Sequence, residues 1–122
     1  MASAKDSPGS READDRSRLV GEIAANAQHV ARLEAEHAGI VAASRESNAD
    51  DEHDPEGTTI AYERQQVVAL LAQAQRTGDG LARALQDLHD GRYGICEQCG
   101  KRIPAERLEA RPNARTCIGC AT

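Results

Sequence analysis

The sequence has few aromatic residues and no thick apolar core. Among 122 residues there is no Phe and no Trp, and the only aromatic side chains are Tyr62 and Tyr93. Apolar residues make up 39% of the chain, and alanine, which buries little area, is the commonest of them. A large globular core is therefore excluded, and another source of stability must hold the chain together.

Long hydrophobic runs and positive charge are also scarce. No run approaches the roughly 18 apolar residues that a membrane helix needs, and the first residues lack the apolar stretch of a signal peptide. Asp and Glu (20) outnumber Lys and Arg (15), so the formal net charge is −5 and general attraction to DNA or to an anionic membrane is not expected. We expect a cytoplasmic protein, in which reduced thiols bind metal rather than form disulfides.

Two segments carry the heptad spacing of a coiled coil, with steps that alternate between four and three residues. The first seam consists of Leu19, Ile23, Asn26, Val30, Leu33, His37 and Ile40. The second consists of Val67, Leu71, Ala74, Gly78, Leu81, Leu85 and Leu88. Two seams of similar length predict a mainly α fold, in which residues 16–90 form a long antiparallel helical hairpin (coiled coil).

The second seam crosses two glycines. The stretch RTGDG (76–80) has the composition of a loop, since an interior glycine costs about 1 kcal/mol relative to alanine. The heptad phase nevertheless passes through it unbroken, which favours one helix from about 56 to 90 over two helices with a hinge. Gly78 lies on the seam, where a missing side chain lets the partner helix approach. Gly80 lies off the seam and is expected to be only a local cost.

An acidic segment separates the two seams. Residues 46–57, ESNADDEHDPEG, hold six carboxylates and no Lys or Arg. Pro55 and Gly57 indicate a turn and the start of a second helix, so this segment is the predicted tip of the hairpin. Residues 1–15 are small, polar and charged, and we expect them to form a disordered N-terminal tail.

All four cysteines lie within the last 30 residues. Cys96 and Cys99 form one C-x-x-C pair, Cys117 and Cys120 form another, and 17 residues separate the pairs. Zn²⁺ prefers four tetrahedral ligands, and thiolates at about 2.3 Å suit it. The spacing predicts a C-terminal zinc-finger nodule with four cysteine ligands over residues 91–122. A dithiol redox pair, an iron–sulfur centre and disulfides are the alternatives.

The predicted metal is structural, because a full thiolate shell leaves no open position for water. Gly100, directly after the first pair, fits the tight turn of such a knuckle, since glycine tolerates positive φ. The nodule holds six basic and three acidic residues. They form either a solvated surface or a modest basic face for an acidic partner, which is a protein or a nucleic acid.

Residues 81–120, LARALQDLHDGRYGICEQCGKRIPAERLEARPNARTCIGC, resemble the DksA/TraR family of zinc-finger regulators of bacterial RNA polymerase. The resemblance rests on Gly-x-Tyr-Gly-x-Cys at 91–96, Ile-Pro at 103–104 and Arg-Leu-Glu-Ala-Arg-Pro at 107–112, followed by the second C-x-x-C at the family's spacing. It implies a non-enzymatic role. Family members insert their hairpin into the secondary channel of RNA polymerase and place acidic tip residues near its active centre. Some members act with the alarmone (p)ppGpp and others act without it.

The family's tip pattern is two aspartates three positions apart, followed by an alanine two positions later. Asp51 and Asp54 match the aspartates, whereas Glu56 stands in place of the alanine. Asp54 has a second interpretation, because an Asp before Pro55 is a good helix N-cap. The sequence stops two residues after Cys120, so contacts made by the C-terminal helix of longer members cannot be carried over.

These observations predict a transcription regulator that binds RNA polymerase directly, with no sequence-specific DNA binding and no membrane association. A nucleic-acid-binding zinc ribbon and a thiol-based redox-sensing zinc protein are the alternatives. An enzyme is not expected, because no Ser/His/Asp constellation, Gly-rich phosphate loop or His-Glu-x-x-His motif is present.

Overall fold

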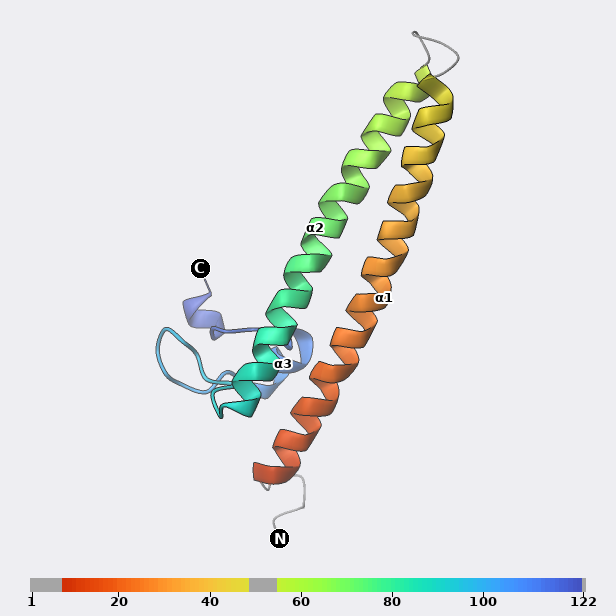
Figure 1. Ribbon diagram of the computed structural model, residues 1–122. Helices are drawn as coiled ribbons and strands as arrows, with labels where there is room; N and C mark the ends of the chain where they lie inside the picture. The colour runs from red at the N-terminus through yellow and green to blue at the C-terminus, as the bar shows by residue number, and fades with distance from the viewer. Residues whose placement is uncertain (1–7, 49–54, 122) are drawn as a thin grey trace. The chain divides into compact units, whose positions relative to one another are not determined.

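The computed structural model describes residues 8–48 and 55–121. These residues form the helices α1 (Pro8–Asn48), α2 (Pro55–His89) and α3 (Ala105–Ala110) and the short 3-10 helix η2 (Ile118–Cys120) (Figure 1). Within the described ranges the β pairing is one isolated bridge, between Ile95 and Arg102. The predicted mainly α fold is confirmed, because α1 and α2 pack against each other as a helical hairpin.

Helix α1 begins earlier than the sequence indicated. Its first residue is Pro8, so the expected tail boundary at residue 15 lies inside the helix. Arg16 pairs with Glu12 at 3.3 Å, and Arg18 pairs with Asp15. Side chains three and four positions apart share a helix face, so these pairs favour helix in a segment whose composition is typical of a tail.

Helix α2 is continuous through both glycines, which confirms one helix rather than two. It ends at a left-handed glycine, Gly91, with φ of 78°. The Gly91 N–H donates to the Leu88 carbonyl at 3.2 Å, and the Arg92 N–H donates to the Asp87 carbonyl at 2.7 Å. These two bonds form a Schellman cap, which satisfies the last carbonyls and turns the chain toward the finger.

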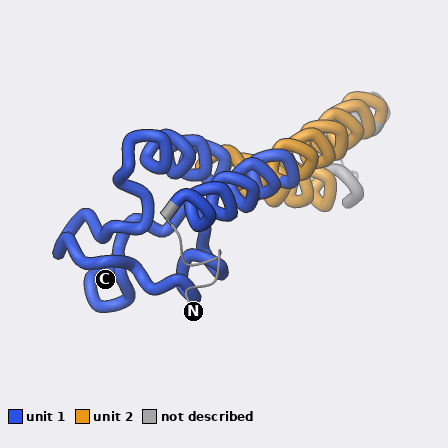
Figure 2. The backbone as a smooth tube through the Cα atoms, turned by 90° about the horizontal axis from the view of Figure 1, so that it is seen from below, with its two compact units in different colours: residues 1–25, 77–122 blue, residues 26–76 orange. Residues whose placement is uncertain are grey.

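The chain divides into two compact units, residues 26–76 and residues 1–25 with 77–122 (Figure 2). In the unit of residues 26–76, the second half of α1 packs against the first part of α2. Its buried residues are Leu33, Val67 and Ala74. The seam residue Asn26 donates from Nδ2 to the Ala74 carbonyl at 3.0 Å. The heptad seams therefore face each other as predicted.

The second unit contains the start of α1, the end of α2 and the finger. One buried cluster joins the helices and consists of Leu19, Leu81, Ala84 and Leu88. Another lies in the finger and consists of Cys96, Ile103 and Leu108. The half-buried Tyr93 packs against both clusters, so it connects the finger to the helices. Among the described residues, no helix combines the length and the apolar character needed to cross a bilayer.

Candidate metal centre

The first C-x-x-C pair lies in a tight knuckle that two glycines permit. Gly94 and Gly100 have φ of 82° and 76°, values that residues with a Cβ rarely adopt. The Gly100 N–H donates to the Cys96 carbonyl at 2.8 Å, and the Cys96 N–H donates to the Lys101 carbonyl at 2.8 Å. The predicted role of Gly100 is confirmed, since its left-handed backbone closes the turn around the cysteines.

The second pair is held beside the first by polar contacts of the finger. The Cys120 N–H donates to the Cys117 carbonyl at 3.1 Å, which forms the turn at η2. The Glu97 N–H, inside the first knuckle, donates to the Arg115 carbonyl at 3.0 Å. From α3, Arg107 Nε donates to the Thr116 carbonyl at 2.8 Å. These hydrogen bonds hold both cysteine turns in place without a contribution from metal.

The four thiols meet at one point. Their sulfur atoms all lie within 4.8 Å of one another. Cys99 Sγ and Cys117 Sγ are 3.8 Å apart, and a tetrahedron with metal–sulfur bonds of about 2.3 Å has edges of about 3.8 Å. The same separation far exceeds the length of a disulfide bond, about 2.05 Å, and all four cysteines are free. The residues fit zinc, and the arrangement argues against disulfides.

The pKa values of two of these thiols are shifted in opposite directions. Hydrogen bonding from the backbone of Cys117 and then of Cys99 lowers the pKa of Cys96 to about 6. Hydrogen bonds from the Cys120 thiol to Cys117 and Cys96 raise the pKa of Cys120 to about 12. Cys96 is buried, with 1% of its surface exposed, so backbone donors rather than water stabilise its thiolate. Of these two thiols, Cys96 therefore ionises first in the metal-free protein, because an ionised sulfur disfavours ionisation of its neighbour.

One hydrogen bond braces the finger itself, and one close contact joins the finger to α2. The Tyr93 hydroxyl donates to the Pro112 carbonyl at 2.8 Å. Gly80 of α2 faces Asn113, whose Nδ2 lies 3.0 Å from the position of a Cβ on that glycine. Gly80 was expected to be only a local cost, and this expectation is wrong, because its bare backbone accommodates the finger. The sequence did offer one signal of this contact, because Gly80 is a helix-interior glycine that the heptad seam does not require.

The structure describes one of the three predicted tip residues. Asp51 and Asp54 lie outside the described residues. Glu56 lies in the first turn of α2, which begins at Pro55. That start is the one that an Asp-Pro pair predicts.

Two C-x-x-C knuckles whose sulfurs converge, carried by a helical hairpin, define a zinc-finger protein with four cysteine ligands. Residues 91–122 match the family model described as "Prokaryotic dksA/traR C4-type zinc finger". The C-terminal finger is thus of the DksA/TraR type, and the cofactor that its four cysteines fit is zinc.

Curated relatives match part of the chain. A Bacillus subtilis protein named YteA is 41% identical over 71 residues, which are 58% of this chain and 30% of YteA. General stress protein 16O of Bacillus subtilis is 38% identical over 72 residues, 59% of this chain and 44% of that protein. RNA polymerase-binding transcription factor DksA of Escherichia coli is 45% identical over 42 residues, 34% of this chain and 28% of DksA. The chain thus spans less than half the length of these relatives.

A solved structure shares the fold over nearly the whole chain. It is that of transcription factor DksA2 from Pseudomonas aeruginosa, with a TM-score of 0.62 and 24% sequence identity. The match covers 98% of this chain and 86% of DksA2. The fold is therefore a known one.

Proposed function

We propose that this protein is a transcription regulator that binds bacterial RNA polymerase directly. The observation that carries the proposal is the combination of a DksA/TraR zinc finger with a two-helix hairpin that has an acidic connection. Relatives in the same family include one named for binding RNA polymerase. The proposed binding site on the enzyme is its secondary channel.

In this proposal the acidic tip is the active part. A pair of helices is narrow enough to enter a channel that passes nucleotides toward a Mg²⁺ site. Carboxylates are hard oxygen ligands that attract such a cation or perturb the groups around it. Asp51, Asp54 and Glu56 are the proposed tip residues.

The proposed role of the finger is structural. All four thiolates of Cys96, Cys99, Cys117 and Cys120 would hold one Zn²⁺ and leave no position for substrate. The ion supplies the folding free energy that this small, apolar-poor module lacks, on the order of 10 kcal/mol for structural zinc. The finger in turn fixes the ends of the hairpin helices through Tyr93.

Binding is tested with the zinc-loaded full-length chain and purified bacterial core RNA polymerase in a pull-down. We expect a stoichiometric complex that survives without DNA. A chain that fails to bind the polymerase contradicts the proposal. Retardation of short DNA or RNA that falls steeply with salt would instead favour the nucleic-acid-binding zinc ribbon.

The tip is tested separately by in-vitro transcription. The double variant Asp51→Asn and Asp54→Asn removes two charges without changing side-chain size, and it should bind the polymerase but lose its effect on transcripts. Asp79→Asn, an exposed acid elsewhere on α2, is the matched control and should act like the unaltered protein. Full activity of the double variant would remove the tip mechanism only. Reactions with and without (p)ppGpp assign the protein to one of the two kinds of family member.

A further inference from the structure

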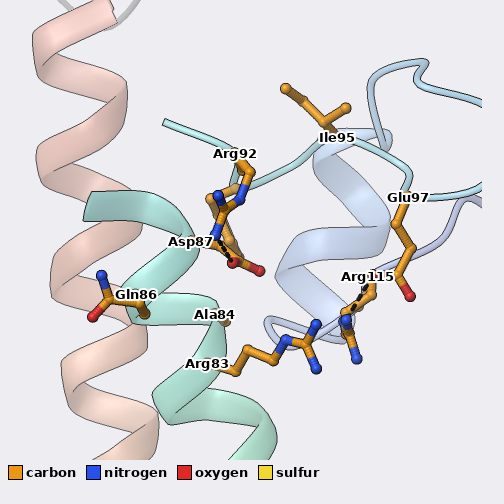
Figure 3. Close-up of a pocket in the computed structure, with 10 residues that line it drawn as sticks. Arg83, Ala84, Gln86, Asp87, Arg92, Ile95, Glu97 and Arg115 are labelled. Atoms are coloured by element: carbon orange, nitrogen blue, oxygen red, sulfur yellow. Dashed lines mark hydrogen bonds and ion pairs between the residues drawn. The ribbon is translucent and has the colours of Figure 1, made fainter. Parts of the chain in front are cut away.

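A cavity of about 390 Å³ lies where the end of α2, the link after it and the finger meet (Figure 3). No cysteine lines it. Three arginines line it, one from each segment: Arg83, Arg92 and Arg115. Two carboxylates also line it, Asp87 and Glu97, so the formal charge of the lining is three minus two, or +1.

The three arginines differ in their ion pairing. Arg92 pairs with Asp87 at 3.4 Å, and Arg115 pairs with Glu97 at 2.7 Å. For Arg83, no ion pair or side-chain hydrogen bond is found within the described parts of the chain. Arg83 is thus the cation that the cavity leaves without a counter-charge.

Figure 3 shows Arg83 reaching toward Arg115 across the cavity. Two guanidinium groups that approach each other repel unless an anion lies between them. The Nε of Arg115 is buried and has no acceptor among the described residues, so the side chain can turn toward the cavity without losing a hydrogen bond from that atom. Its ion pair with Glu97 is partly exposed, at 38% and 46%, and such pairs exchange partners at little cost.

An apolar wall stands beside these cations. It is formed by Ala84, Tyr93, Ile95 and Ala114. Ile95 is 44% exposed, although the finger has few large apolar residues. A ligand that carries an aliphatic group next to its anion would cover this side chain.

We propose that the cavity binds an acidic–apolar segment of a partner protein. One Asp or Glu carboxylate would lie between Arg83 and Arg115, and an adjacent aliphatic side chain would lie on Ile95. Guanidinium groups bind carboxylates through paired, charge-assisted hydrogen bonds. The inference concerns a surface that the proposed function does not use, and it holds whichever protein supplies the segment.

The formal charge of the cavity lining favours a carboxylate ligand over other anions. A lining of +1 balances one carboxylate, whereas a phosphate group or a nucleic-acid backbone brings more negative charge than the cavity can neutralise. The net charge of −5 on the whole chain opposes a polyanion further. A peptide with a single acidic residue is therefore the occupant that the site fits.

The test uses the full-length zinc-loaded protein and the peptide acetyl-Gly-Gly-Glu-Leu-Gly-Gly-amide, observed by NMR at the arginine Nε–H and isoleucine methyl signals. We expect saturable shifts at Arg83, Arg115 and Ile95. Arg83→Gln should weaken binding about tenfold, the loss expected for one hydrogen bond to a charged group. Arg76→Gln removes the same charge from an exposed position of α2 outside the cavity and should leave the affinity unchanged. Zinc content equal to that of the unaltered protein shows that each variant is folded.

The ligand has its own matched control, in which Gln replaces Glu in the peptide and should bind at least about tenfold more weakly. Ile95→Ala should weaken binding of the Glu-Leu peptide and leave that of a Glu-Gly peptide unchanged. The proposal is overturned if the Glu-Leu peptide causes no saturable shift or if the Gln peptide binds equally. Tighter binding of inorganic phosphate or of an oligonucleotide at the same arginines overturns it as well.

Discussion

The side-chain nitrogen of Asn113 lies 3.0 Å from the position that a Cβ on Gly80 would take. The Cβ of Asn113 is 3.6 Å from the same point, an ordinary contact distance. Only the end of the Asn113 side chain would have to move if Gly80 gained a methyl group. Two effects therefore oppose each other at Gly80, a helix-propensity gain and a contact with the finger.

Gly80→Ala is predicted to stabilise the protein by less than an unopposed helical glycine does. An open site gains about 1 kcal/mol, and Gly21→Ala measures this gain because nothing lies within 4 Å of its added Cβ. In an Asn113→Ala background, Gly80→Ala should recover the full gain. Urea unfolding of the single and double variants gives these differences. Equal gains at Gly21 and Gly80 in the unaltered background would contradict the contact.

Zinc binding is predicted to weaken as the pH falls, most steeply below about pH 6. At neutral pH the metal-free chain holds Cys96 as a thiolate and Cys120 as a thiol, because their pKa values are about 6 and about 12. Zinc must therefore displace a proton from Cys120 at any physiological pH, and one from Cys96 only below its pKa. Metal binding that needs deprotonated ligands competes with protons in this way.

Calorimetric titration with zinc in buffers of different ionisation enthalpy counts the released protons. The count should rise by about one between neutral pH and about pH 5. An unchanged number of released protons would mean that Cys96 does not take up a proton between neutral pH and about pH 5. Protein with all cysteines alkylated is the control and should bind no zinc.

Tyr93→Phe is predicted to destabilise the finger by about 1 kcal/mol. The change keeps the ring between the two buried clusters but removes the hydrogen bond from the hydroxyl to the Pro112 carbonyl at 2.8 Å. Tyr62→Phe is the matched control, since Tyr62 is 63% exposed and its change should be close to neutral. Denaturant unfolding, monitored by zinc release, measures the stability of both variants. Equal destabilisation by the two changes would show that the hydrogen bond to Pro112 contributes nothing.

Asn26→Leu is predicted to raise the stability of the hairpin and to weaken its preference for one register and one oligomeric state. Asn26 occupies a seam position and donates to the Ala74 carbonyl, a contact that a slipped or intermolecular pairing would lose. Polar residues at such positions fix register and oligomeric state at a cost in stability. Size-exclusion chromatography with light scattering should show association of Asn26→Leu and none of Gln28→Leu, which adds leucine at an exposed position off the seam. A monomeric Asn26→Leu protein would show that the loop connection alone sets the pairing.

The seams and the cysteines could be predicted because each is a local pattern with one geometric solution. Leu33 and Val67 are buried where the heptads place them, and two C-x-x-C turns can share one ion. The contact of Gly80 with Asn113 could not be predicted, because no periodicity connects residues of a helix and a finger. The start of α1 at Pro8 could not be predicted either, because ion pairs such as Arg16–Glu12 favour helix in a segment whose composition is typical of a tail.

The clusters that join α1 to α2 are built from leucine, valine and alanine, and the described core contains no large aromatic side chain that is fully buried. Unfolding such a protein exposes little hydrocarbon for its length, and the heat capacity of unfolding follows that exposed area. Its stability should accordingly change slowly with temperature, with a shallow curve, a broad thermal transition and little tendency toward cold denaturation.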